Sequence, residues 1–317
     1  MIPWPDASDE RRTGFNLDVP RNGYAWWYVD AISDDGREGL TIIAFIGSVF
    51  SPYYAFARRR APADPLDHCA LNVALYRPGG KTWTMTERGR GRVARNVHSF
   101  LIGPSDLGWD GKALTINIRE RSAPIPGRIE GRVRVTPQAI TKQVFVLNPD
   151  GNHRWWPIAP RSRIEVDLRR PDLSWRGEAY LDTNAGDAPI ETGFKHWEWA
   201  RGALRDKTAI LYEAERRDGS RIDLAMTFDA QGNMQPFTPP PLLPLARSGW
   251  KVARSARSET DARLLRTLED TPFYARSMID TTLLGEPVTL MHESLSLDRF
   301  KMPVVQAMLP FRMPRRK

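Results

Sequence analysis

Two short stretches of the sequence each hold a pair of reactive side chains. His153 and Trp155 are separated by one residue, and so are Tyr180 and Asp182. Alternate side chains of a β-strand lie on the same face of a sheet, so each pair would share a face if both stretches are strands. Together the pairs supply an imidazole, an indole, a phenol and a carboxyl group, a set suited to proton transfer in an apolar site. The spacing leaves open whether the pairs converge on one cavity or are hydrogen-bonded strand residues near a barrel mouth.

Aromatic side chains follow the same alternation in a third stretch, residues 24–32, which contains Trp26 and Tyr28. Asp30 either faces a pocket with them or is an ordinary carboxylate beside the following turn, and we favour the second interpretation. The chain has 11 Trp among 317 residues. Because Trp combines a large apolar surface with one polar atom, this content suits walls around a large apolar ligand.

Other chemistries find little support in the sequence. His98, His196 and His292 lack the close spacing of metal ligands, so we expect no metal site. His68 and Cys69 are neighbours in an extended run and therefore point to opposite faces, which prevents a direct dyad. The sequence has no Gly-x-Ser-x-Gly motif, which argues against an α/β-hydrolase.

The basic charge of the chain raises the question of an anionic partner. The formal net charge is +8, with clusters at 58–60, 88–95 and 312–317. No RNA-binding or zinc-finger motif accompanies them, so we expect no nucleic-acid partner. Solvated basic faces are the first interpretation, and contact with a membrane surface is the second. Cys69 is the single cysteine, which excludes an intramolecular disulfide and favours a reducing compartment.

Turn signals such as Asp-Asp-Gly at 34–36, Asp-Gly at 110–111 and Asp-Gly at 218–219 separate strand-like runs along the whole chain. The runs are residues 24–32, 70–76, 113–119, 131–135, 164–168, 209–215 and 222–228. Without a glycine-rich loop opening onto a helix or an alternation of strands and helices, this pattern predicts an antiparallel all-β fold of barrels or sandwiches.

Helical signals are few. Residues 260–268 resemble one short helix, and a second helix is expected from Asp298, with Pro303 in its first turn and Pro310 at its end. Residues 39–57 carry no charge but contain glycine, serine and proline, so we expect a buried strand followed by a loop, not a membrane-spanning helix.

Longer motifs resemble the carotenoid 1,2-hydratases, also called hydroxyneurosporene synthases, of phototrophic bacteria. The motifs are GYAWWYVDA at 23–31, IAFIGSVFSPYY at 43–54, DHCALNVALY at 67–76, MTERGR at 85–90, HRWWPIAP at 153–160, GEAYLDTNAG at 177–186 and WEWAR at 197–201. The resemblance covers most of residues 23–201. It implies two tandem lipocalin-like antiparallel β-barrel domains with a few short helices, at 1–185 and 186–317, and a substrate pocket where they meet.

The resemblance also implies an activity and a site. The activity is the cofactor-free addition of water to the terminal 1,2 double bond of acyclic carotenoids such as neurosporene and lycopene. The family's active-site His, Trp, Tyr and Asp correspond here to His153, Trp155, Tyr180 and Asp182. We expect Trp26, Tyr28, Trp156 and Trp199 to contact the substrate. The main alternative is a carotenoid- or lipid-binding protein of the same fold without catalysis, and a cyclase on the same scaffold is a further one.

Chemistry assigns a role to each of the four residues. Asp182 would donate a proton to C2, with its neutral form favoured by burial in an aromatic pocket. Trp155, together with Trp156 or Trp199, would face the cation at C1, and Tyr180 would hold Asp182 in place. His153 would orient the water and accept its proton, with a pKa near the working pH.

A hydrocarbon substrate resides in the bilayer, so we expect a cytoplasmic protein associated peripherally with the inner, intracytoplasmic membrane. Residues 304–311 and the basic residues at 312–317 have the composition of an interfacial anchor. The alternative is a helix that closes the second barrel, followed by a solvated tail. The oligomeric state is left open.

Overall fold

The computed structural model describes residues 14–316, and Lys317 of the basic tail lies outside the described residues. The fold consists mostly of antiparallel strands with a few short helices, which confirms the predicted fold class. The chain divides into two compact units. The first contains Met1–Pro189 and Ala307–Lys317, and the second contains Ile190–Gln306.

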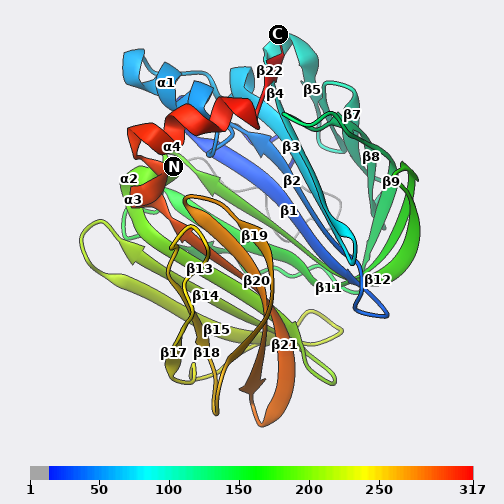
Figure 1. Ribbon diagram of the computed structural model, residues 1–317, viewed down its shortest axis with the longest axis vertical. Helices are drawn as coiled ribbons and strands as arrows, with labels where there is room; N and C mark the ends of the chain where they lie inside the picture. The colour runs from blue at the N-terminus through cyan, green and yellow to red at the C-terminus, as the bar shows by residue number, and fades with distance from the viewer. Residues whose placement is uncertain (1–13, 317) are drawn as a thin grey trace. The chain divides into compact units, whose positions relative to one another are not determined.

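One curled sheet forms the first unit (Figure 1). Its strands follow the order β22-β4-β3-β2-β1-β12-β11-β9-β8-β7-β6-β5, and β10 pairs with β11. Their bounds are β1 (Tyr24–Ser33), β2 (Gly39–Ile46), β3 (Cys69–Arg77), β4 (Gly80–Arg88), β5 (Val93–Arg95), β6 (Ser99–Ile102), β7 (Ser105–Trp109), β8 (Leu114–Arg121), β9 (Arg128–Pro137), β10 (Phe145–Val146), β11 (His153–Arg170), β12 (Asp172–Gly186) and β22 (Arg315–Arg316).

Both faces of the central part of the first unit's sheet are buried. In β1, Ala25, Trp27, Val29 and Ala31 belong to the hydrophobic core, where they meet side chains of the other strands. The residues that alternate with them therefore lie on the opposite face, and these are Tyr24, Trp26, Tyr28 and Asp30. Because both faces of this part of the sheet are buried, polar groups on the second face must find partners within the protein.

Two prolines interrupt the regular pairing of β11 with β12. Pairing is continuous from His153 opposite Gly186 to Trp156 opposite Thr183, and register shifts follow between Trp156 and Ser162. Pro157 and Pro160 lie within these shifts and lack the N–H group that a regular ladder requires. The irregularity therefore begins only after the segment that carries His153 and Trp155.

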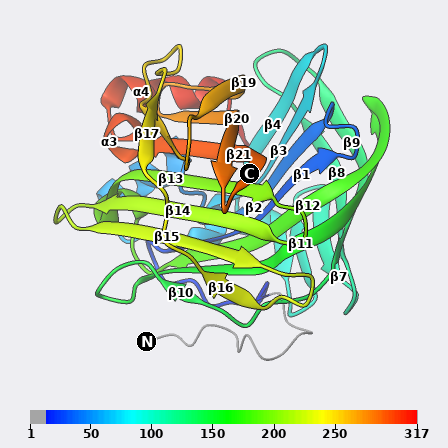
Figure 2. The same cartoon turned by 90° about the horizontal axis from the view of Figure 1, so that it is seen from below.

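The second unit contains a curled sheet with the order β16-β15-β14-β13-β21-β20-β19 and a separate pair, β17-β18 (Figure 2). A smaller hydrophobic core, which includes Leu211, Ala256 and Ile279, joins the sheet and the pair. The bounds are β13 (Phe194–Ala203), β14 (Thr208–Arg216), β15 (Arg221–Phe228), β16 (Met234–Pro236), β17 (Leu242–Leu245), β18 (Arg254–Arg257), β19 (Arg263–Asp270), β20 (Tyr274–Leu283) and β21 (Glu286–Ser296).

The helices are short. They are α1 (Pro52–Arg60), α2 (Ile190–Gly193), α3 (Leu297–Phe300) and α4 (Pro303–Met308), with 3₁₀ turns η1 (Pro65–His68), η2 (Arg90–Arg92) and η3 (Leu309–Phe311). Within residues 14–316, none of the helices combines the length and the apolar composition needed to cross a bilayer. The expected helix near the C-terminus forms as α3 and α4, and Pro310 lies in the turn that follows.

Two local predictions were wrong. Residues 260–268 form no helix, because β19 pairs with the next strand, β20, and alternate side chains such as Leu264 are partly buried, so strand pairing outweighs the local helical pattern. The buried strand expected within 39–57 is β2, but the following segment is helix α1 instead of a loop. The Ser51 hydroxyl caps α1 by accepting a hydrogen bond from the Tyr54 amide, and Pro52 occupies the first turn.

The C-terminal tail is attached to the first unit. β22 pairs in parallel with β4, and the Glu87 amide donates a hydrogen bond to the Pro314 carbonyl. The Arg315 guanidinium forms an ion pair with the buried carboxylate of Glu87, which also accepts a hydrogen bond from His68. One cation of the tail is therefore used inside the protein and is not available to a membrane.

Candidate active site

The four residues singled out by their spacing lie on one face of two neighbouring strands. β12 lies between β1 and β11, so its alternate residues face side chains from both neighbours. Tyr28 is opposite Asp182, and both His153 and Tyr24 are opposite Gly186. This is the sheet face directed away from the hydrophobic core of the unit, which contains Leu181 and Ala185 instead.

Three of the four residues are joined by hydrogen bonds at one carboxylate oxygen of Asp182. Oδ2 of Asp182 accepts a hydrogen bond of 2.9 Å from Nε1 of Trp155 and one of 2.7 Å from the Tyr180 hydroxyl. Asp182 is 4% exposed, and the two donors are fully buried. Trp155 therefore reaches Asp182 across the β11–β12 ladder, and Tyr180 reaches it along β12, as neighbours on one face of a sheet can.

His153 lies on the same face but at some distance along the sheet. It stands opposite Gly186, four residues from Asp182 on β12, which corresponds to about 13 Å of strand. Trp155, opposite Asn184, occupies the position between them. The indole thus separates an acid end of the site from an imidazole end.

The imidazole of His153 is held by contacts within the first unit. Its Nδ1 and the Tyr24 hydroxyl form a hydrogen bond of 3.0 Å, and its backbone amide donates to the side chain of Asn148. Burial lowers the pKa of His153 to about 4, although the nearby Asp187 carboxylate opposes this shift. The sequence-based expectation of a pKa near the working pH is therefore wrong, because His153 is buried and neutral at neutral pH.

Aromatic rings surround the two ends of the site. The rings of Phe145 and Trp155 are 5.0 Å apart, and those of Tyr28 and Tyr180 are 6.1 Å apart in an edge-to-face arrangement. Trp26 stacks on Tyr24 with a ring separation of 5.0 Å. These rings exclude water from the polar groups, which strengthens the electrostatic interactions among them.

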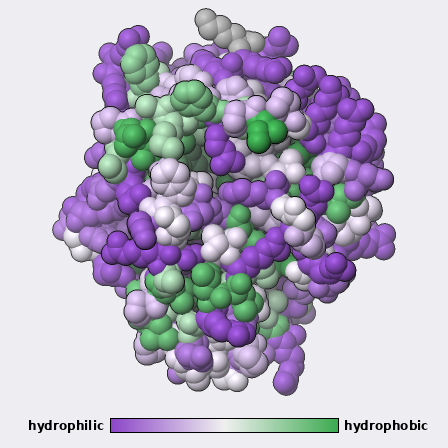
Figure 3. All heavy atoms as spheres, viewed as in Figure 1, coloured by the Kyte–Doolittle hydropathy of each residue, from purple (hydrophilic) through white to green (hydrophobic). Residues whose placement is uncertain are grey.

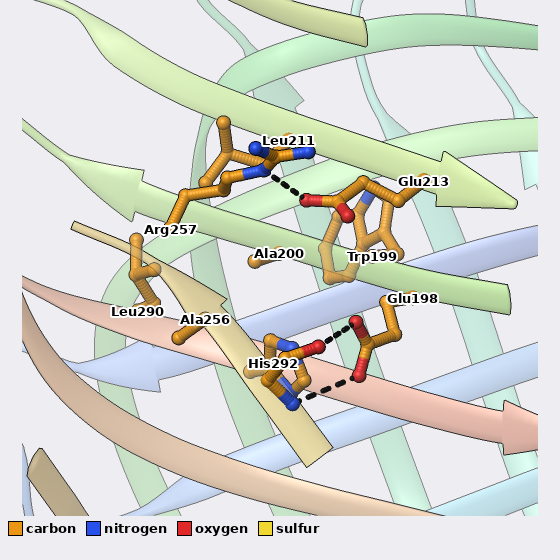
Figure 4. A pocket seen from close by; sticks show the side chains of 10 residues that line it. Glu198, Trp199, Ala200, Leu211, Glu213, Ala256, Arg257, Leu290 and His292 are labelled. Carbon is orange, nitrogen blue, oxygen red and sulfur yellow. Dashed lines mark hydrogen bonds and ion pairs between the residues drawn. The ribbon is translucent and has the colours of Figure 1, made fainter. Parts of the chain in front are cut away.

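Two of the residues expected to contact substrate do not belong to this face of the first unit. Trp156 points into the hydrophobic core on the opposite face, where its Nε1 donates a hydrogen bond to the Thr141 carbonyl. Trp199 belongs to the second unit and lines a pocket with Glu198 and His292 (Figure 4). The first unit therefore brings Trp26, Tyr28 and the four reactive residues to one face and leaves Trp156 out of it.

The pocket around Trp199 is lined by apolar side chains together with a few ionisable ones, including Glu198 and His292. Glu198 accepts hydrogen bonds from the Ser255 amide and the Ser294 hydroxyl. Burial alone would raise the pKa of Glu198, but the hydrogen bond from His196 and the nearby His292 outweigh it and lower the pKa to about 2. Glu198 is therefore ionised and held by partners, which is typical of a structural cluster and unlike a proton-donating acid.

Sequence reasoning missed two residues of the first unit's site. Tyr24 contacts His153, and Phe145 packs on Trp155. Tyr24 could have been found, because it belongs to the alternating series of Trp26 and Tyr28. Phe145 gives no comparable signal, since β10 is only two residues long. Among the described residues, 14–316, no group of three or more His, Cys, Asp or Glu side chains is arranged to hold a metal ion.

Comparisons with known proteins relate this chain to a family of enzymes. It is 54% identical to the acyclic carotenoid 1,2-hydratase of Thiocapsa roseopersicina over 98% of its own length and 78% of that protein. It is 52% identical to the enzyme of the same name from Rubrivivax gelatinosus, over 95% of its own length and 76% of the relative. Among solved structures, the AttH protein of Nitrosomonas europaea matches with a TM-score of 0.59 and 16% identity, over 88% of this chain and 93% of the other.

The structural match supports the lipocalin-like fold at an identity too low to indicate a shared reaction. The family model described as carotenoid hydratase CrtC matches residues 42–317, which include His153, Trp155, Tyr180 and Asp182. With this match and two relatives above 50% identity over nearly the whole chain, the protein belongs to the carotenoid hydratase CrtC family.

Proposed function

We propose that this chain is a carotenoid 1,2-hydratase that adds water to the terminal 1,2 double bond of an acyclic carotenoid, such as neurosporene or lycopene, without a cofactor. The observation that supports the proposal most directly is the buried carboxyl of Asp182, whose Oδ2 accepts hydrogen bonds from Trp155 and Tyr180. The relatives named acyclic carotenoid 1,2-hydratase supply the substrate class.

Asp182 is the proton donor in this proposal. A proton moves from the carboxyl to C2 of the alkene, which leaves a tertiary cation at C1 and a carboxylate on the enzyme. The indole N–H and the phenol O–H already point at Oδ2, so they stabilise the carboxylate as it forms without any reorganisation. Because both donors occupy Oδ2, the transferred proton belongs on Oδ1 in the neutral acid.

The cation forms beside an aromatic ring. Trp155 lies next to Asp182 along the face, and a cation over an indole ring gains about 2 kcal/mol when water is excluded. Trp26 and Tyr28 lie on the same sheet face as Asp182, so their rings would contact the hydrocarbon chain of the substrate.

Water attacks C1 and loses a proton to His153. A pKa of about 4 makes His153 a weak base, but a protonated tertiary alcohol is a far stronger acid than an imidazolium group, so the transfer is favourable. The imidazolium then releases its proton to solvent, and the Asp182 carboxylate takes up a proton from solvent, which restores the resting state. The net reaction is the addition of one water to one double bond.

The direct test is incubation of the purified protein with lycopene and, separately, with neurosporene in the absence of any added cofactor. The proposal predicts products heavier by one water, with the hydroxyl at C1. A carotenoid that is bound but recovered unchanged would support the non-catalytic carrier. A product of unchanged mass but altered absorption would support a cyclase.

The carrier alternative is less consistent with the site. A carrier for hydrocarbons gains nothing from a carboxyl group on a buried face, because removing a carboxylate from water costs free energy unless other interactions offset it. Here Asp182, 4% exposed, is bound by two dedicated donors, and an apolar residue of similar size would avoid the cost altogether.

We further propose that the protein acts from the cytoplasmic side and contacts the inner membrane peripherally, where its substrate resides. Helix α1 supports this location, because Phe56 is 52% exposed and is followed by Arg58, Arg59 and Arg60. Hydrophobic side chains are exposed among hydrophilic ones where Figure 1 draws α1, at the upper left of Figure 3. An exposed ring next to cations suits an anionic bilayer surface.

The C-terminal segment supports membrane contact through an exposed ring, and not through all of its basic residues. Phe311 is 74% exposed, whereas Arg315 is bound to Glu87 and Arg312 packs over the Trp83 ring. Phe56→Ser and Phe311→Ser are therefore the informative substitutions, and Ile125→Ser, at an 81% exposed loop position, is the control. Sedimentation with anionic vesicles should fall for the first two and not for the control. Equal sedimentation of all three variants and the wild type would contradict a role of this surface.

A further inference from the structure

Three neighbouring strands place two aromatic side chains on either side of a glycine. Tyr24 of β1 and His153 of β11 are both opposite Gly186 of β12, the strand between them. Side chains two strands apart are normally separated by the side chain of the central strand. Gly186 has none, so the Tyr24 hydroxyl reaches Nδ1 of His153 across it, at 3.0 Å.

This contact leaves no room for a side chain at position 186. A Cβ atom at position 186 would lie 2.3 Å from Cε1 of Tyr24 and 2.7 Å from Nδ1 of His153. Real Cβ atoms do not approach other atoms so closely, so any larger residue would push one or both rings aside. The glycine is therefore a structural requirement of the contact between Tyr24 and His153.

We propose that Tyr24 is a positioning residue for the hydration reaction, acting through Nδ1 of His153 across Gly186. This inference rests on the proposed function. The hydrogen bond fixes the plane of the imidazole and assigns Nε2 to the reacting water. The water proton passes to Nε2, and the resulting imidazolium donates its Nδ1–H to the Tyr24 oxygen. The imidazolium then releases a proton to solvent and the Asp182 carboxylate regains one from solvent, so the acid, the imidazole and the hydroxyl all end in their starting state.

The surroundings of Tyr24 fit a fixed support. Tyr24 is 1% exposed, and its ring stacks on Trp26 at an interplanar angle of 14°. The backbone next to it is held as well, since the Tyr54 hydroxyl donates a hydrogen bond of 2.7 Å to the Gly23 carbonyl. Burial holds the pKa of His153 below its ordinary value, so an oxygen placed at Nδ1 gives the imidazolium a partner that water cannot supply there.

The test combines a spectroscopic and a kinetic readout on the full chain. Tyr24→Phe removes the hydroxyl and keeps the ring, Gly186→Ala inserts the methyl group between the rings, and Tyr212→Phe removes a hydroxyl from an equally buried tyrosine of the second unit. In ¹⁵N-histidine-labelled protein, Tyr24→Phe should shift the His153 nitrogen resonances, and Tyr212→Phe should not. With carotenoid substrate, Tyr24→Phe should lower kcat about ten-fold with little change in KM.

The double variant tests whether the two residues act as one unit. If both act through the same hydrogen bond, Tyr24→Phe combined with Gly186→Ala should be no slower than the slower single variant. If Gly186→Ala fails to fold, the ¹⁵N shifts and the kcat of Tyr24→Phe decide alone. Unchanged His153 resonances, or an unchanged kcat in an active enzyme, would overturn the proposal. A wild-type protein that makes no hydrated product would instead overturn the proposed function, while the ¹⁵N shifts would still report on the contact.

Discussion

Burial of His153 predicts a specific loss of stability in acid. The pKa of this group is about 4 in the folded protein against 6.5 in the unfolded chain, so between these values the unfolded chain binds the proton and the folded protein does not. Its contribution is therefore fully present above the unfolded pKa and is lost as the pH falls from 6.5 towards 4. The shift corresponds to about 3 kcal/mol at the acid end of this range and about 2 kcal/mol near pH 5.

The assay compares the wild type with His153→Gln, which cannot take up the proton. Urea unfolding near pH 7.5 and near pH 5 gives the free energy of unfolding of each protein. The wild type should lose about 2 kcal/mol more than the variant between the two conditions. Other titrating groups, including His292 with its own lowered pKa, are present in both proteins and cancel in this difference. Equal losses in the two proteins would refute the reasoning that burial keeps His153 neutral.

Two further predictions concern hydrogen-bonded groups of the first unit. Trp155→Phe keeps an aromatic ring but removes the donor to Asp182, so single-turnover hydration should slow by about ten- to a hundred-fold, and an unchanged rate would exclude this hydrogen bond from catalysis. Arg88→Met leaves the buried carboxylate of Glu120 without its cation and should lower the free energy of unfolding in urea by about 3 kcal/mol or more, whereas Arg134→Met, at an exposed ion pair, should cost less than about 1 kcal/mol. Equal effects of the two arginine substitutions would show that burial of an ion pair does not determine how much it contributes to the free energy of unfolding.

Alternation in the sequence was sufficient to predict which of the candidate side chains share a face of the sheet. Residues two apart in a strand share a face, and this rule alone pairs His153 with Trp155 and Tyr180 with Asp182. The same rule places Trp156 on the opposite face from Trp155, in the core, so the expectation that Trp156 contacts the substrate went against it. Alternation does not give the register between strands, and it is this register that brings Trp155 within hydrogen-bonding distance of Asp182.

Contacts across several strands were beyond the sequence. The approach of Tyr24 to His153 requires that both lie opposite the same residue and that this residue is glycine. Local pattern also failed for β19, whose sequence suits a helix until β20 pairs with it. In both cases the deciding interaction is a pairing between strands, which the pattern within one segment does not reveal.

Proton delivery by Asp182 is the central claim, and hydration in D₂O measures it most directly. The wild type should convert lycopene to a product that carries one deuterium at C2 and one hydroxyl at C1. Asp182→Asn should retain its fold and bind the carotenoid but form no such product. A variant that hydrates lycopene at the wild-type rate, or a wild-type product without deuterium at C2, would contradict the account.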